Sequence, residues 1–432
     1  MKVLVIGGGG REHAIVDAIV RSDSTASVYC VPGNAGIAAQ AKCLSMDPND
    51  FSGLVSFCKK EGIDLTIVGP EQFLSQGIVD FFMEKGLRIF GPTKEAARLE
   101  TSKVFAKHFM KRWGIPTAKF QVFNSGQRDE LEDYVKNSKY PLVLKADGLA
   151  GGKGVVIVND YAQVKVELTN FFDRKVFGSA GETIVVEEFL NGVEASLFAV
   201  TDGKNYVLLP SAQDYKRIGE NDTGLNTGGM GAFAPTPFLD EKNLKIVRSE
   251  IIERVIEGTN AEAFPFRGCL YCGLMITANG PKVVEFNSRF GDPETQSVLP
   301  LIEPQFLDLV LSSVNGELND FQIKTGKEVS VCVVAASRGY PGKYEVGKEI
   351  NNLDFEFDDV RVYHSGTRFQ DERIVTSGGR VLSSVGIDRN GSYAVAAERA
   401  YRALEKISFE GMYFRRDIGS KVIQYEKQQG AK

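Results

Sequence analysis

The feature that most constrains the fold is a regular alternation of predicted strands and helices over residues 1–93. Short apolar runs, such as residues 3–6 and 65–68, predict buried strands. Amphipathic segments at residues 12–21, 51–61 and 73–85 predict helices between the strands. Strands that are joined through helices pair in parallel, so this alternation predicts a doubly wound parallel sheet. The remaining chain mixes strands and helices less regularly. The predicted fold class is therefore a multidomain protein with α/β and α+β parts.

Glycine-rich turns follow the predicted strands, at residues 7–10, 32–36, 69–71 and 91–93. All four would lie at the carboxyl edge of the sheet, where such sheets bind ligands, and a helix start there favours an anion. The dinucleotide fingerprint is not satisfied, because Glu12 stands where its third glycine is required. The pattern favours a phosphate-bearing small molecule, with Arg11 as a counter-charge, over a nicotinamide cofactor. A tight turn without a ligand is the alternative interpretation.

A second glycine-rich loop, residues 148–154, lies between two predicted strands. It lacks the P-loop spacing, because Gly154 rather than Ser or Thr follows Lys153. A loop of this kind can fold over nucleotide phosphates, as in kinases, and Lys145 ends the strand before it. The loop is the candidate lid of a nucleotide site, and a hairpin without a ligand is the alternative.

The strand that ends at Asn287 carries the clearest metal signal. With the period of two that strands have, Glu285 and Asn287 share one face, whereas Val284 and Phe286 are predicted to point into a core. A carboxylate and an amide oxygen are hard ligands suited to Mg²⁺. Arg289 follows, and its guanidinium can form two parallel hydrogen bonds with a carboxylate or a phosphoryl group. A strand with a merely polar face is the alternative.

Other segments give weaker signals. The predicted strand at residues 184–188, with its polar end at 187–190, could offer backbone groups to an adenine edge, with Glu194 nearby for ribose hydroxyls. A long segment without clear periodicity contains residues 214–217 and 226–231, and such segments are usually functional or disordered. Strands at residues 329–335, 360–364, 373–376 and 380–386 and a helix at 394–406 predict a C-terminal domain packed against the nucleotide domain. His364 lies in one of these strands and is interpreted as structural.

The composition argues against several classes of protein: nucleic-acid binders, disulfide-rich proteins and membrane proteins. The 51 Lys and Arg residues against 56 Asp and Glu give a net charge of −5 without a basic cluster, so nucleic acid is not an expected partner. Six cysteines are too few for a disulfide scaffold, and Cys269 and Cys272 are predicted to be buried, reduced thiols. No apolar run approaches a membrane span or a signal peptide, so we expect no membrane partner and a cytoplasmic location.

Seven motifs occur in a fixed order along nearly the whole chain: GGGGREHA, PGNAG, VGPE, LKADGLAGGKGV, EEFLNGVEAS, NTGGMGAF and VEFNSRFGDPETQ. Together they resemble the glycinamide ribonucleotide synthetase (phosphoribosylamine–glycine ligase) family of ATP-grasp enzymes. The resemblance implies an N-terminal pre-ATP-grasp domain of residues 1–100 and an ATP-grasp region of 101–327, with 124–188 as its lid. It implies a small mixed C-terminal domain of residues 328–432.

The resemblance also implies an activity: ATP-dependent ligation of glycine to 5-phosphoribosylamine through glycyl phosphate, in de novo purine biosynthesis. The implied partners are the small molecules ATP, glycine and phosphoribosylamine, and the implied state is a monomer or weak dimer. The implied nucleotide-binding residues are Lys103, Lys145, Gly151, Lys153, Glu187, Leu190 and Glu194. The implied substrate-binding residues are Gly9, Arg11, Asn34, Gly36, Asp214 and Asp292. Glu285 and Asn287 would bind Mg²⁺ or Mn²⁺, and Arg289 and Lys145 would be catalytic.

Three positions depart from the family pattern. Tyr215 stands where His is usual, which puts in doubt an acid or base role there. Leu225 stands where Pro is usual and Cys272 where a small residue is usual, and both are interpreted as packing changes. Three other functions stay open on the sequence alone: a different purine-pathway ATP-grasp enzyme, a nicotinamide oxidoreductase and a non-catalytic nucleotide sensor.

Overall fold

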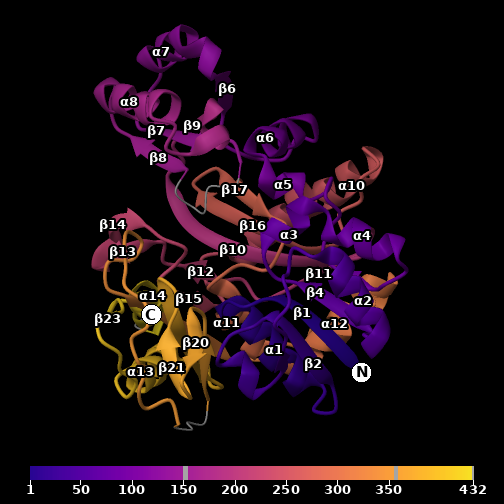
Figure 1. Ribbon diagram of the computed structural model, residues 1–432. Coiled ribbons are helices and arrows are strands. Elements are labelled where there is room, and N and C mark those ends of the chain that lie inside the picture. Colours follow the sequence, from indigo (N-terminus) through magenta and orange to yellow (C-terminus); the bar gives the residue numbers. More distant parts are fainter. Residues whose placement is uncertain (149–153, 355–358, 431–432) are drawn as a thin grey trace.

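The computed structural model describes residues 1–148, 154–354 and 359–430. Its N-terminal part is a sheet of order β3-β2-β1-β4-β5 in which every pair of neighbours is parallel (Figure 1). The strands are β1 (Lys2–Gly7), β2 (Ser27–Pro32), β3 (Lys42–Cys43), β4 (Leu65–Val68) and β5 (Ile89–Phe90). The helices are α1 (Gly10–Ser22), α2 (Phe51–Glu61), α3 (Glu71–Gln76) and α4 (Ile78–Glu84). The predicted doubly wound parallel sheet is confirmed.

The apolar run of β1 is buried on both faces of this sheet. Val3 and Val5 pack in one core with α1, and Leu4 and Ile6 pack in another core with α2 and α4. This two-sided burial is why the strand reads as a continuous apolar run rather than an alternating one. One predicted helix, residues 73–85, is wrong in detail: Gly77 adopts a left-handed conformation (φ +90°) and divides it into α3 and α4.

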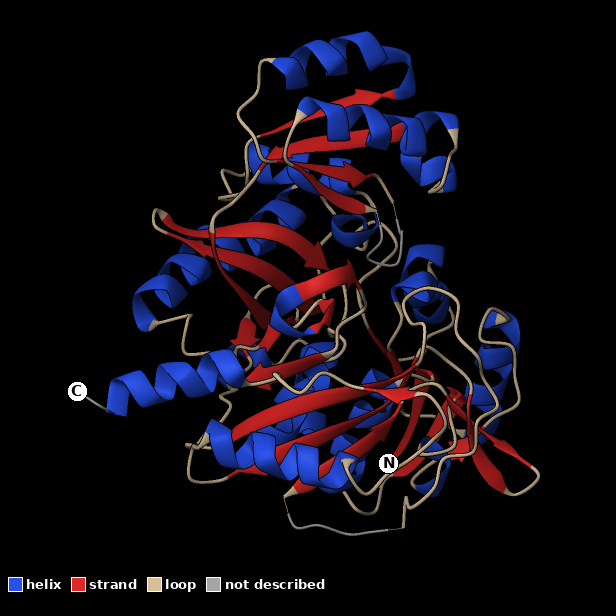
Figure 2. Ribbon diagram, turned by 90° about the vertical axis from the view of Figure 1, so that its left-hand side faces the viewer, coloured by secondary structure: helices blue, strands red, loops and turns tan. Residues whose placement is uncertain are grey.

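The region predicted as the lid contains a separate antiparallel sheet of order β6-β9-β7-β8, at the top of Figures 1 and 2. Its strands are β6 (Phe120–Asn124), β7 (Leu142–Ala146), β8 (Val155–Val158) and β9 (Thr183–Glu188), and its main helices are α7 (Arg128–Lys136) and α8 (Tyr161–Leu168). It has its own apolar core, which includes Leu144, Val164 and Val186. β7 and β8 pair antiparallel, so the second glycine-rich loop joins two strands, as predicted.

A second antiparallel sheet, of order β11-β10-β16-β17, lies in the region predicted to be of ATP-grasp type. Its strands are β10 (Gly192–Thr201), β11 (Tyr206–Leu208), β16 (Gly268–Thr277) and β17 (Gly280–Asn287). Nearby helices are α5 (Arg98–Thr101), α6 (Lys103–Arg112), α9 (Glu241–Ile246) and α10 (Glu253–Ala261). Cys269 and Cys272 lie in β16 as buried free thiols, which confirms the prediction for this pair.

A register shift in β17 overturns one prediction. The pairing steps from Gly273–Glu285 to Leu274–Val283, which leaves Val284 without a partner in the ladder. Val283 is therefore the buried residue, and Val284 is half-buried rather than in the core. A bulge of one residue changes which side chains face inward, and local alternation alone does not reveal it. Beyond the bulge, Phe286 is buried in the core, as predicted, and Glu285 and Asn287 are half-buried.

The C-terminal sheet has the order β12-β15-β18-β22-β19, and β23 also pairs with β18. Its strands are β12 (Gln213–Asp214), β15 (Gly231–Ala234), β18 (Val329–Ser337), β19 (Val360–His364), β22 (Arg380–Asp388) and β23 (Met412–Tyr413). Two small hairpins accompany it, β13 (Arg217–Gly219) with β14 (Thr223–Asn226) and β20 (Thr367–Gln370) with β21 (Arg373–Thr376). The segment without periodicity is thus folded: it supplies β12 to β15.

Three helices connect or cover these parts: α11 (Glu294–Val298), α12 (Phe306–Asn315) and α13 (Tyr393–Leu404). The last helix, α14 (Ser420–Gly430), carries the C-terminal end (Figure 2). Among the described residues, no single helix is long and apolar enough to cross a membrane. The helical segments Glu294–Leu301 and Glu303–Asn315 reach that length and apolar composition only when they are taken together, and the chain bends by 80° between them.

The C-terminal sheet also contacts the N-terminal domain, beyond the predicted contact with the nucleotide domain. The backbone N–H of His364 donates to Nδ1 of His13 on α1 at 2.8 Å, and the Tyr363 hydroxyl donates to Asp17 at 3.1 Å. Burial lowers the pKa of His13 to about 3, with a further contribution from His364. Burial also lowers the pKa of His364 to about 4. Both rings are therefore neutral in the folded protein at neutral pH.

This pair predicts a pH dependence of stability. Between about pH 6.5 and 3 the unfolded chain binds a proton at His13 that the folded chain excludes, so the free energy of unfolding falls as the pH falls. Denaturant unfolding at several values between pH 7 and 4.5 measures the slope. His13→Gln is expected to flatten it, whereas His108→Gln, at an exposed position, is the control. An unchanged slope in the His13 variant would contradict the assignment.

Candidate active site

The turns after β1 and β2 leave the N-terminal sheet at the same edge, because Gly7 and Pro32 are in register. They approach so closely that a Cβ on Gly8 would lie 2.5 Å from the carbonyl oxygen of Gly33. The Asn34 amide joins them, since it donates to the carbonyl oxygen of Gly8 at 2.9 Å and to that of His364 at 2.7 Å. Its Oδ1 accepts from the N–H of Gly36 at 2.9 Å. The predicted substrate residues Asn34 and Gly36 thus lie in a fixed turn beside the C-terminal domain.

A pocket lies against β10, β16 and β17, and its lining includes Glu194, Ser196, Lys216, Tyr271, Val284 and Glu285. Two of the predicted nucleotide and metal residues, Glu194 and Glu285, line it together. Lys216 is 2.6 Å from Glu194 and 3.7 Å from Asp214. Lys216 lowers the pKa of Glu194. Burial raises the pKa of Asp214 to about 7, and the nearby carboxylates of Glu294 and Glu194 act in the same direction while Lys216 opposes them.

The predicted phosphate lysines meet next to this pocket. Nζ of Lys145, at the end of β7, lies 3.0 Å from Oε1 of Glu187 and 3.1 Å from the carbonyl oxygen of Val284. Lys107 holds the other oxygen of Glu187 at 3.0 Å. Nζ of Lys103, at the start of α6, donates to the carbonyl oxygen of Gly148 at 3.0 Å. Lys145 therefore links the sheet that contains β7 and β9 to β17.

Burial and neighbouring charges change the pKa values of the lysines Lys103 and Lys107. Burial lowers the pKa of Lys103; Glu285 opposes this effect and Lys145 adds to it. Burial also lowers the pKa of Lys107, to about 8, against the attraction of Glu187. The buried side chain of Glu187 forms ion pairs with two lysines, Lys107 and Lys145. Leu190 follows in the chain and is half-buried.

Glu285 and Asn287 fit a divalent ion by the chemistry of their donors. One carboxylate and one amide oxygen, side by side at the end of β17, match the usual Mg²⁺ site in which phosphates and water complete the shell. Among the described residues, no group of three or more His, Cys, Asp or Glu side chains could hold a metal by itself. An ion here would therefore depend on the phosphates of a bound nucleotide.

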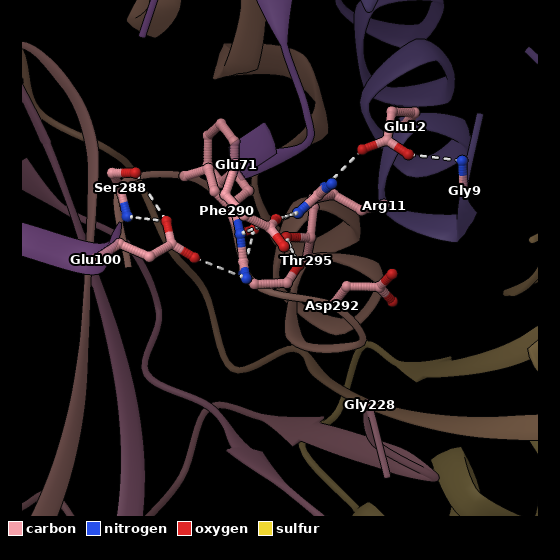
Figure 3. Close-up of polar contacts among 12 residues, drawn as sticks. Gly9, Arg11, Glu12, Glu71, Glu100, Gly228, Ser288, Phe290, Asp292 and Thr295 are labelled. Atoms are coloured by element: carbon pink, nitrogen blue, oxygen red, sulfur yellow. Dashed lines mark hydrogen bonds and ion pairs between the residues drawn. The ribbon is translucent and has the colours of Figure 1, made fainter. Parts of the chain in front are cut away.

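Arg289 lies in a network of buried and half-buried charges that comes from three parts of the chain. Figure 3 labels its partners Glu71 and Glu100 and the neighbouring Arg11. Its Nε is 3.0 Å from Glu71, at the start of α3, and its Nη2 is 3.0 Å from Glu100 on α5. Arg11 is 2.6 Å from Glu12, 3.9 Å from Glu71 and within hydrogen-bond distance of the Phe290 carbonyl oxygen. Burial opposes ionisation of Glu71, but Arg289 and Arg11 outweigh it and lower the pKa of Glu71 to about 2.

Asp292 connects the C-terminal domain to this network. Arg380, on β22, is 2.7 Å from its carboxylate and also donates to the carbonyl oxygens of Asp292 and Gly228. Gln296 donates to the same carboxylate at 2.7 Å. A Cβ on Gly9 would lie 3.9 Å from Oδ2 of Asp292, which places the first glycine-rich turn beside it. Two predicted substrate residues, Gly9 and Asp292, are thus neighbours, whereas Gly151 and Lys153 lie outside the described residues.

Five polar residues of this site were not predicted: Glu71, Glu100, Lys216, Glu294 and Arg380. Glu294 is buried and accepts hydrogen bonds from Ser196 and Tyr271. Three of the five lie in segments that the sequence analysis singled out. Glu71 lies in a glycine-rich turn, Lys216 in the segment without periodicity and Glu294 in the last motif. Glu100 and Arg380 had none, because they reach the site only through contacts between residues far apart in the chain.

Tyr215 points away from the pocket. It is buried in the C-terminal core, its hydroxyl accepts from the N–H of Gly419 at 3.0 Å, and burial raises its pKa to about 12. Tyr215→Phe would leave that buried N–H without its acceptor, so we expect a loss of about 1–3 kcal/mol in the free energy of unfolding with kcat unchanged. Denaturant titration and a rate assay test this together. A fall in kcat without a loss of stability would instead give the hydroxyl a role in chemistry.

Comparisons with known proteins agree with this arrangement. The phosphoribosylglycinamide synthetase N, ATP-grasp (A) and C domain models match residues 1–100, 101–295 and 330–421. The biotin carboxylase domain of the Hydrogenobacter thermophilus 2-oxoglutarate carboxylase has a TM-score of 0.73 at 17% identity, over 96% of this chain and 91% of that one, and shows the shared fold alone. The fold and the site define the protein as an ATP-grasp enzyme.

Relatives with higher sequence identity show to which family of ATP-grasp enzymes the chain belongs. The phosphoribosylamine–glycine ligases of Caldanaerobacter subterraneus and Chlorobaculum tepidum are 48% and 47% identical, over 97% and 98% of this chain and all of theirs. The crystal structure of that enzyme from Thermotoga maritima has a TM-score of 0.82 at 34% identity, over 97% of this chain and 100% of that one. The chain belongs to the phosphoribosylglycinamide synthetase family.

Proposed function

We propose that this chain joins glycine to 5-phosphoribosylamine with ATP, giving glycinamide ribonucleotide, ADP and phosphate in purine biosynthesis. The observation that carries the proposal is a set of contacts that link three parts of the chain. Lys145 lies at the carbonyl of Val284, next to Glu285. The first glycine-rich turn of the N-terminal domain lies beside Asp292, which pairs with Arg380 of the C-terminal domain. The full-length identity to phosphoribosylamine–glycine ligases supports the same reaction.

The first proposed step activates glycine. A carboxylate oxygen of glycine attacks the γ-phosphorus of ATP, the bond from that phosphorus to the ADP oxygen breaks, and glycyl phosphate forms. Phosphoryl transfer depends on alignment and charge neutralisation more than on a strong base. Lys103 and Lys145 would face the ATP phosphates, and Arg289 would steady the transferred group. A Mg²⁺ or Mn²⁺ ion held by Glu285 and Asn287 would supply further neutralisation when bound.

The second proposed step forms the amide bond. The amine of phosphoribosylamine attacks the acyl carbon, the bond from carbon to the phosphate oxygen breaks, and the amine loses a proton. We assign the phosphoribosylamine to the turns at Gly9, Arg11, Asn34 and Gly36, and the glycine or amine to Asp214 and Asp292. Because an acyl phosphate hydrolyses readily, the site must exclude water. The lid of residues 124–188, with Gly151 and Lys153 in its loop, would close over the nucleotide, whose adenine and ribose we assign to the Glu187–Leu190 hinge and Glu194.

ADP release with defined acceptors tests the proposed function. Sustained ADP formation should require ATP, glycine and phosphoribosylamine together, and the organic product should be glycinamide ribonucleotide. Replacing glycine with formate or bicarbonate should abolish ADP formation. ADP formation that is indifferent to glycine would point to another ATP-grasp ligase, and tight ATP binding without turnover would point to a nucleotide sensor.

A further inference from the structure

Glu100 holds three consecutive residues at the end of β17. Its Oε2 accepts from both the backbone N–H and the hydroxyl of Ser288, each at 2.7 Å (Figure 3). Its Oε1 lies 3.0 Å from Nη2 of Arg289. When the Asn287 amide is oriented with its nitrogen toward Glu100, that nitrogen donates to Oε1 at 3.1 Å. The side chain of Glu100 is 5% exposed. A single buried carboxylate therefore has contacts with the predicted metal ligand and with the predicted catalytic arginine.

These contacts decide which way the Asn287 amide faces. An asparagine amide has a donor side and an acceptor side of nearly the same shape, so its neighbours must select one orientation. Both groups on one side of Asn287, the Glu100 carboxylate and the Phe286 carbonyl at 3.2 Å, are acceptors, and they select the nitrogen. The amide oxygen is thereby turned away from Glu100 and is the atom left to meet a cation.

Glu100 itself is saturated. A carboxylate offers about four acceptor positions. Two donors from Ser288, one from Arg289 and one from Asn287 occupy them. A divalent ion bound directly by Glu100 would have to displace one of these donors. The geometry therefore suits a residue that orients the ligand rather than one that binds the metal.

We propose that Glu100 is a positioning residue that keeps the Asn287 amide oxygen and the Arg289 guanidinium directed toward the nucleotide-bound metal and the transferred phosphoryl group. The proposal rests on the proposed function, since it takes Asn287 as a metal ligand. Partners that orient metal ligands in this way typically account for 10- to 100-fold in metal affinity. Glu100 comes from α5, so the junction between the N-terminal domain and the ATP-grasp region would tune the metal site.

Mn²⁺ binding to the full chain with a non-hydrolysable ATP analogue, followed by electron paramagnetic resonance, tests this without turnover. Glu100→Gln replaces an acceptor with an NH₂ group that must face a donor, so we expect Mn²⁺ to bind about 10- to 100-fold more weakly. Glu262→Gln is the matched control, because Glu262 accepts from Arg112 and Trp113 at the end of α6. It should bind Mn²⁺ as the unmutated chain does.

A double variant separates the possible outcomes. If Glu100 acts through Asn287, Glu100→Gln combined with Asn287→Ala should bind Mn²⁺ no more weakly than Asn287→Ala alone. Additive losses, or normal Mn²⁺ binding by a folded Glu100→Gln, would overturn the role of Glu100. Normal binding by Asn287→Ala would overturn the metal assignment and the role of Glu100 with it, while glycine-dependent ADP formation would still support the ligase.

A crystal of the unmutated chain with Mn²⁺ and the ATP analogue gives a measurement that does not depend on the variants folding. The Asn287 nitrogen should stay within hydrogen-bond distance of Glu100 while its oxygen contacts the ion. Glu100 bound directly to Mn²⁺, or Asn287 turned away from Glu100, would overturn the proposal.

Discussion

Replacing Glu285 with Gln is expected to lower kcat by at least about 100-fold and to leave the fold intact. Gln has nearly the same shape, and Glu285 is half-buried at the pocket, where packing does not depend on its charge. The lost charge is the metal-binding carboxylate of the proposed site, and metal-ion stabilisation of a phosphoryl transition state amounts to several kcal/mol. Each 1.36 kcal/mol corresponds to about tenfold in rate.

Steady-state ADP formation and a thermal unfolding curve measure the two effects in the same preparation. Glu253→Gln on α10 is the control, because this carboxylate accepts from Tyr206 away from the pocket. Its rate should equal that of the unmutated chain. A Glu285→Gln rate within a few-fold of normal would contradict the metal assignment.

Replacing Arg289 with Lys is expected to lower kcat by about 10²- to 10³-fold, the range seen when one group that stabilises a transition-state charge is removed. Arg289 contacts Glu71 through Nε and Glu100 through Nη2, each at 3.0 Å, so its guanidinium is held from two sides. Lysine keeps the charge but has no planar fork, and therefore cannot keep both contacts while it faces a phosphoryl group. The KM for ATP should change much less than kcat.

Arg112→Lys provides the matched control for this prediction. Arg112 forms a similar forked pair with Glu262, through Nε at 3.0 Å and Nη2 at 2.8 Å, but on the exposed end of α6. Initial rates over a range of ATP and glycine concentrations give kcat and KM separately for both variants. Equal rates for Arg289→Lys and Arg112→Lys would show that Arg289 has only a structural role.

Local sequence patterns predicted the parts of the fold that depend on local periodicity. The helix Phe51–Glu61 and the strands Leu65–Val68, Val360–His364 and Arg373–Thr376 have the predicted bounds. Each is a short segment that is recognised from its own apolar pattern and from the turn residues directly beside it. The glycine-rich turns at the carboxyl edge of the first sheet were predictable for the same reason, since parallel pairing follows from strand and helix alternation.

Features that depend on distant contacts were not predictable in this way. The bulge that leaves Val284 only half-buried is fixed by pairing with β16. The irregular segment becomes ordered because β15 pairs with β18, about 100 residues away. Glu100 reaches Ser288 across 188 positions of sequence, and Arg380 reaches Asp292 across 88. Neither residue has a local pattern, since a single charged residue on a helix or strand is usually a solvated one.

The central claim is that ATP phosphorylates the carboxylate of glycine in this site before the amide bond forms. Glycine labelled with ¹⁸O in both carboxylate oxygens, incubated with ATP and phosphoribosylamine, tests it by mass spectrometry of the products. The mechanism predicts one ¹⁸O in inorganic phosphate and one in the new amide carbonyl. Phosphate without ¹⁸O, at a normal yield of glycinamide ribonucleotide, would contradict it.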